Sequence, residues 1–163
     1  MTQADHESPD LPAIRVIRRA DRSADTPQTD GIHRLVALDG KTFPDGQLSA
    51  FTSFVQPRTW TAAHHHGAQD TVLFVLSGQA AYAWGERLEN VAWAAAGDFV
   101  YIPAGVVHQE INPSRDVATE WVVVRSGAQP VVVNLTELDR LAEHRAAACL
   151  SHRARQAPDR HSG

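Results

Sequence analysis

Two groups of histidines are the residues of this chain whose types and spacing best suit chemistry. The first is His64-His65-His66, and the second ends in His108, after Pro103-Ala104-Gly105-Val106-Val107. Because alternate residues of a β-strand point to the same face, His64 and His66 share a face and His65 points away. Imidazoles from separate strands can bind a single metal ion. The spacing therefore predicts one divalent metal ion held by His64, His66 and His108.

The residues around His108 form a regular pattern. Gly97, Pro103, Gly105, His108 and Asn112 follow one another as G-x5-P-x-G-x2-H-x3-N without a gap. Glycine and proline at these positions favour tight turns on either side of a short strand. His108 then opens the next strand, where its imidazole can meet the first histidine pair.

This pattern is similar to the second motif of the cupin superfamily, a group of small β-barrels of the jelly-roll kind. The first cupin motif, G-x5-H-x-H-x3–4-E-x6-G, is matched by His64, His66 and Gly78, while Arg58 stands at its leading glycine position. The resemblance covers roughly residues 47–135. It implies a small single-domain bacterial cupin, with an all-β fold closed into a jelly-roll barrel.

The glutamate of the first motif leaves alternatives open for a fourth metal ligand. Counting from His66 places Asp70 there, whereas counting back from Gly78 places Thr71 there, and the full separation favours Thr71. With Thr71 in this place, the ion has three histidine ligands and no carboxylate. If a bulge turns Asp70 inward, Asp70 either binds the ion or accepts a hydrogen bond beside it. Gln69 is a third, weaker candidate.

The resemblance also implies an activity. Imidazole ligands suit several metals; iron(II) is favoured, and zinc, nickel or manganese are alternatives. Cupin oxygenases with three-histidine iron sites cleave diketone-like substrates, so we expect a non-haem iron(II) dioxygenase acting on a small carbonyl or phenolic compound. The alternatives are a redox-neutral cyclase or isomerase that acts on a substrate of the aromatic polyketide type, and a ligand-binding cupin without turnover.

Charged residues near the motifs are further candidates for a role in catalysis or in substrate binding. Strand alternation places Glu110 on the same face as His108, where it would hydrogen-bond a ligand histidine or act as a catalytic base. An exposed strand glutamate is an equally good interpretation of Glu110. Arg34 and Arg125 would either bind a carboxylate or face solvent, and we favour solvent.

Short strand candidates separated by turn residues make up most of the chain and predict an all-β sandwich or barrel. They lie at 13–20, 32–38, 47–56, 71–76, 79–84, 88–94, 98–102, 108–111, 118–125 and 131–135. One short C-terminal helix is predicted from Glu137 to about Leu150, capped by Thr136. We expect a flexible N-terminal arm at 1–12, the cupin domain at 13–150 and a disordered tail at 151–163.

The composition and charge of the chain limit the classes of partner that it can bind. The chain has 163 residues, 43% of them hydrophobic, which suits one domain with a real core. A net charge of -4 without a clustered basic face argues against nucleic acid. No apolar run is long enough to span a membrane, and the single cysteine, Cys149, fits a cytoplasmic location. We expect a small-molecule substrate. Cupins often dimerise through strands at the barrel edge, so the resemblance also implies a homodimer, in which residues 13–20 would swap onto the partner's sheet edge.

Overall fold

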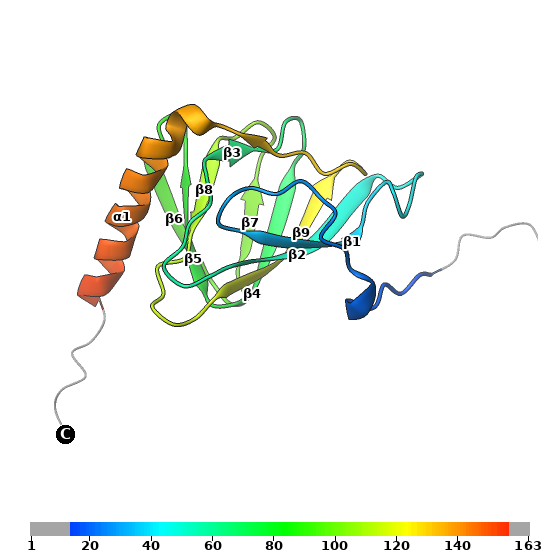
Figure 1. Ribbon diagram of the computed structural model, residues 1–163, viewed down its shortest axis with the longest axis horizontal. Helices are drawn as coiled ribbons and strands as arrows, with labels where there is room; N and C mark the ends of the chain where they lie inside the picture. Colours follow the sequence, from blue (N-terminus) through cyan, green and yellow to red (C-terminus); the bar gives the residue numbers. More distant parts are fainter. Residues whose placement is uncertain (1–13, 157–163) are drawn as a thin grey trace, which may run out of the picture.

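The computed structural model describes residues 14–156, so the predicted arm at 1–12 and the end of the predicted tail, 157–163, lie outside the described residues. Short strands dominate and form two five-stranded antiparallel sheets, ordered β1-β2-β9-β4-β7 and β10-β3-β8-β5-β6 (Figure 1). The strands are β1 His33–Leu38, β2 Leu48–Val55, β3 His64–His65, β4 Thr71–Ser77, β5 Gln79–Trp84, β6 Asn90–Ala95, β7 Phe99–Ile102, β8 His108–Ile111, β9 Thr119–Ser126 and β10 Val133–Asn134. The predicted all-β jelly-roll barrel is confirmed.

The barrel closes around an apolar core because its strands alternate between buried and more exposed residues. On β2 every second residue is buried, and β9 pairs with it in a register that sets Phe51 opposite Val123. Inward side chains from both sheets, including Leu73, Tyr82 and Trp121, form one cluster with them. This alternation decides which residues can face the barrel interior.

Gly78 forms the tight turn that joins β4 to β5. Its φ is +76°, and a Cβ at this position would lie 2.7 Å from the carbonyl oxygen of Ala118. Glycine is therefore required on both conformational and steric grounds. This is the last glycine of the first motif, and it fixes where β4 ends relative to the histidines.

The helix α1, Asp139–Gln156, lies against the outer face of the second sheet, at the left of Figure 1. A second buried cluster fills this contact and contains Ala83, Ile111 and Ala146. The helix begins after a 3-10 turn, Thr136–Leu138, and continues past Leu150, where the sequence predicted its end. Residues 151–156 of the predicted disordered tail are therefore helical.

The strand predicted at 13–20 is wrong for the residues that the structure describes there. Residues 14–18 have no regular structure, and Arg19–Asp21 forms the 3-10 helix η1. The apolar side chains of Ile14 and Val16 are exposed, and this segment pairs with no strand among residues 14–156. Among the described residues, no helix is both long and apolar enough to cross a membrane.

Candidate metal centre

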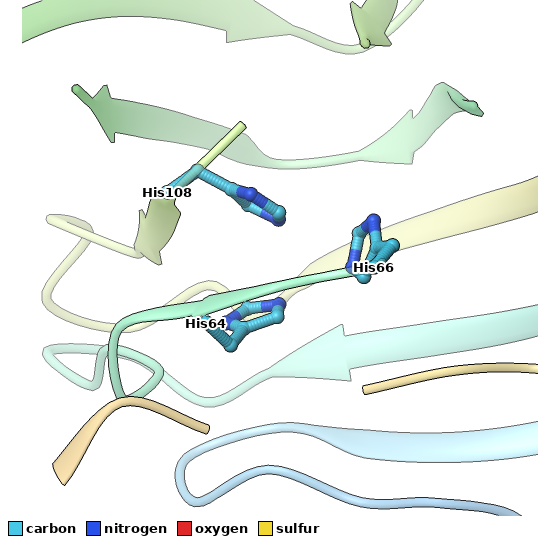
Figure 2. Close-up of side chains that lie close together, drawn as sticks. All are labelled: His64, His66 and His108. Atoms are coloured by element: carbon cyan, nitrogen blue, oxygen red, sulfur yellow. The ribbon is translucent and has the colours of Figure 1, made fainter. Parts of the chain in front are cut away.

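The three predicted histidines meet inside the barrel. His64 on β3 pairs directly with His108 at the start of β8, and His66 is the residue directly after β3. Their ring centroids lie 5.2 Å (His64–His66), 4.4 Å (His64–His108) and 4.6 Å (His66–His108) apart, and Figure 2 shows the rings gathered between the strands. One nitrogen from each ring lies within 4.8 Å of the others. Two nitrogen ligands of one ion can be at most about 4.2 Å apart, so small ring rotations bring all three into range.

Two of these rings present an unpartnered nitrogen to the same space. Nδ1 of His64 donates to the Ala62 carbonyl at 2.9 Å, and Nδ1 of His108 donates to the Val106 carbonyl at 2.8 Å. Because each Nδ1 carries the proton, each Nε2 has a free lone pair. Both Nε2 atoms are buried and have no hydrogen-bond partner. This is the arrangement that metal-binding histidines adopt, so the site fits a divalent metal ion.

His66 has partners at both ring nitrogens. Its Nδ1 lies 2.8 Å from the hydroxyl oxygen of Thr71, and its Nε2 accepts a hydrogen bond from Nη2 of Arg125 at 2.7 Å. The guanidinium can only donate, so Nε2 supplies the lone pair and Nδ1 donates to Thr71. That one lone pair serves either Arg125 or a metal ion. His66 therefore joins the metal site only when Arg125 moves off it.

Burial keeps the three imidazoles neutral. Loss of water is the largest effect on each and lowers the pKa of His64 to about 3, with the pKa values of His66 and His108 lowered as well. The Arg125 guanidinium lowers the pKa of His66 further. Neutral imidazole is the form that binds metals, so the site needs no proton loss at neutral pH.

Glu110 lies beside the cluster and is buried, so the interpretation of an exposed strand glutamate is wrong. Its two carboxylate oxygens lie 3.8 Å from Nε2 of His64 and 3.9 Å from Nε2 of His108. The Thr61 hydroxyl donates to Oε2 at 2.8 Å. Burial raises the pKa of Glu110, but the positive charge of Arg34 and the hydrogen bond from the Thr61 hydroxyl lower it; the net shift is downward, so the carboxyl is ionised at neutral pH.

The structure corrects the prediction of Asp70 as a fourth ligand. Asp70 is exposed, and its Oδ1 accepts hydrogen bonds from the Tyr101 hydroxyl at 2.9 Å and the Ala104 N–H at 3.1 Å. Thr71 takes the inward position because it is the first residue of β4 and alternation turns its predecessor outward. Gln69 also stays out of the site, since its amide bonds the backbone of Ser126 and other residues of the loop that follows.

Arg34 and Arg125 are buried, only 3% and 2% exposed, so the expectation that they face solvent is wrong. Both line a small cavity of about 10 Å³ together with His66 and Glu110. Burial lowers the pKa of Arg34 to about 10 and that of Arg125 to about 9, so both remain charged at neutral pH. The alternation of Trp121, Val123 and Arg125 on β9 was the sequence signal for an inward arginine.

Comparison with known proteins places these features in a family. The cupin domain family matches residues 51–125, which include both histidine motifs. Residues 51–125 form a cupin domain, and the two sheets have the jelly-roll arrangement. No curated protein sequence matches it.

Several solved structures share the fold. The polyketide cyclase RemF from Streptomyces resistomycificus is 17% identical with a TM-score of 0.62, over 85% of this chain and 97% of that one. An uncharacterized conserved protein with a double-stranded β-helix domain from Klebsiella pneumoniae is 20% identical with a TM-score of 0.57, over 75% and 97%. Oxalate decarboxylase from Bacillus subtilis is 18% identical with a TM-score of 0.59, over 68% of this chain but 30% of its own, and that enzyme has Mn(II) centres.

Proposed function

We propose that this cupin is a metal-dependent enzyme whose single divalent ion binds a small oxygen-bearing organic substrate. The observation that carries the proposal is the pair of buried Nε2 atoms, on His64 and His108, that have lone pairs and no partner. A buried polar atom without a partner is costly, and a bound cation removes that cost. In the version we favour, the ion is iron(II) and the enzyme is a dioxygenase of carbonyl or phenolic compounds.

The chain's own residues divide the work around such an ion. His64, His66 and His108 would hold it, and the ion would supply a Lewis-acid or redox centre with open coordination positions. Neutral ligands leave its full positive charge available to an anionic oxygen. The apolar side chains of Phe51 and Val123 exclude water from this part of the barrel.

Glu110 supports a second version, a redox-neutral cyclase or isomerase. Its carboxylate is ionised, buried and oriented by the Thr61 hydroxyl, which suits a base that takes a proton from a carbon next to a carbonyl group. The same fold in a polyketide cyclase and an oxalate decarboxylase is compatible with either version, because likeness at this identity extends to the fold alone. The dioxygenase and cyclase versions differ in whether oxygen is consumed.

Oxygen uptake by the protein loaded with iron(II) or zinc tests the two versions, with a panel of diketones, phenols and linear polyketide analogues. The dioxygenase version predicts oxygen loss equal to substrate loss, with iron only. Substrate loss without oxygen uptake would establish the cyclase or isomerase version. Tight binding with no product across the panel would instead indicate a ligand-binding cupin.

Glu110→Gln tests the role of the carboxylate, with Glu120→Gln on the exposed face of β9 as its control. As a base, Glu110 should contribute about a hundredfold or more to kcat, with metal content unchanged in the variant. Loss of metal from Glu110→Gln would mean that this carboxylate binds the ion. Full activity with full metal content would exclude both roles.

The homodimer and the cytoplasmic location remain proposals. Exposed Ile14 and Val16 are compatible with a segment that packs on a second copy, as the sequence predicted. Sedimentation velocity of the full chain tests this, because a monomer at micromolar concentration would contradict it.

A further inference from the structure

Two guanidinium groups share the barrel interior with a single carboxylate. Among the residues that line the cavity beside the histidines, Arg34 and Arg125 are positive and Glu110 alone is negative. Within residues 14–156, neither arginine lies within 4.0 Å of a carboxylate oxygen. A buried charge is normally paired, because removing it from water without a partner is strongly unfavourable. Here the positive charges exceed the negative before any metal ion is added.

The hydrogen bonds of the two arginines also leave donors available. Arg34 donates from Nη1 to the Pro27 carbonyl at 3.4 Å, and Arg125 donates from Nη1 to the Val131 carbonyl at 3.0 Å. The Nε of Arg125 is buried without a partner, and so is the hydroxyl of Ser53, which lines the same cavity. A guanidinium carries five N–H donors, so these backbone contacts position both groups without using them up.

The contact between Arg125 and His66 also indicates that Arg125 needs another acceptor when a metal ion is bound. A metal ion needs the lone pair of His66 Nε2 that now accepts from Arg125 at 2.7 Å. Once the ion takes that lone pair, the guanidinium loses its acceptor and stands beside an added positive charge. The strongest replacement acceptor is an anionic oxygen, and a carboxylate fits the planar donor edge of arginine.

We propose that Arg34 and Arg125 form an anion subsite next to the metal centre, and that the substrate therefore carries a carboxylate or an equivalent anionic oxygen group. This rests on the proposed metal-dependent function and narrows its substrate class. The cavity itself, about 10 Å³, holds about one water molecule, so the substrate enters as Arg125 swings off His66. Arg34 and Ile32 also line an open pocket of about 660 Å³, which gives the larger part of the substrate a place.

Malonate and its neutral isostere malonamide test the subsite by titration calorimetry. The titrations use the full chain, zinc-loaded and zinc-free, with metal content measured on the same samples. The variants are Arg125→Gln and Arg34→Gln, and exposed Arg115→Gln serves as the matched control. Arg125→Lys keeps the charge but not the planar donor edge, and it covers the case in which a glutamine variant fails to fold.

The proposal predicts that the wild type prefers malonate over malonamide and that Arg125→Gln and Arg34→Gln each reduce this preference by about tenfold to hundredfold. Arg115→Gln should keep the wild-type preference, and Arg125→Lys should keep part of it. Equal affinity for the acid and the amide, no malonate binding, or an unchanged preference in both glutamine variants would overturn the subsite. If zinc fails to bind but the arginine-dependent preference persists, the metal-dependent function fails and the anion subsite stands.

Discussion

Replacing Arg58 with glycine should stabilise the protein. Arg58 occupies the leading glycine position of the first motif, and its φ is +54°, in the left-handed region. Its backbone N–H donates to the Ser114 carbonyl at 3.0 Å, which holds this conformation in the segment between β2 and β3. The side chain is exposed, so its removal leaves no cavity.

The expected gain follows from two opposing contributions. A side chain with a Cβ in the left-handed region costs about 1–2 kcal/mol, which glycine avoids. Glycine also lowers the free energy of unfolding by about 0.5–1 kcal/mol, because it makes the unfolded chain more flexible. The net stabilisation is about 0.5–1 kcal/mol, or about 1–4 °C in Tm for a domain of this size.

Urea denaturation and thermal melting by circular dichroism measure the change. Arg58→Ala is the matched variant that removes the same charge but keeps the Cβ, and it should stay within about 0.5 kcal/mol of the wild type. Arg115→Gly, at a position without positive φ, should destabilise. A midpoint for Arg58→Gly at or below that of Arg58→Ala would refute the reasoning that backbone strain is present at this position.

Three further substitutions test the site and its support. His64→Ala should weaken metal affinity by more than about a hundredfold, because the loss of only a ligand's hydrogen-bond partner already weakens metal affinity by about 10- to 100-fold. His65→Ala should leave metal affinity unchanged. Equal losses in the two variants would contradict the predicted strand faces. Asp70→Asn should retain full metal content by mass spectrometry, because Asp70 is exposed and bonded outside the cluster; metal loss would restore it as a ligand. Gln109→Leu should lower the free energy of unfolding, measured in urea, by about 2–3 kcal/mol. The backbone carbonyls of Thr61, shortly before β3, and of Ala142 in α1 would each lose the donor that the Gln109 amide provides. Wild-type stability would show that water replaces the amide.

Much of the fold could be predicted because its signals are local. Period-two alternation and the turn residues gave the strands now seen as β2, β4 and β8 within a residue or two of their ends. The histidine site followed from the same alternation, applied to His64, His66 and His108. Strand faces depend on neighbouring residues alone, which a single sequence contains.

The charged interior could not be predicted with the same rules. An arginine on a strand is usually exposed. This general preference led to the prediction that Arg34 and Arg125 face solvent, although strand alternation places both side chains on the inward face. Asp70 was a candidate ligand because it is a carboxylate close to His66 in the sequence. It is adjacent to Thr71, however, so the two side chains point to opposite faces of the strand. Glu110 is buried because the barrel closes around it, and the Thr61 hydroxyl that bonds it and the Arg34 charge that acts on it come from segments far away in the sequence.

The most direct test of the account is X-ray absorption spectroscopy of the protein purified without chelators and loaded with iron(II) or zinc. We predict about one ion per chain, with a coordination shell that contains three imidazole nitrogens at about 2.0–2.1 Å for zinc. His108→Ala should lose one imidazole from that shell. A protein that retains no ion, or an ion with a shell of oxygen atoms alone, would contradict the central claim that this barrel is built around a three-histidine metal site.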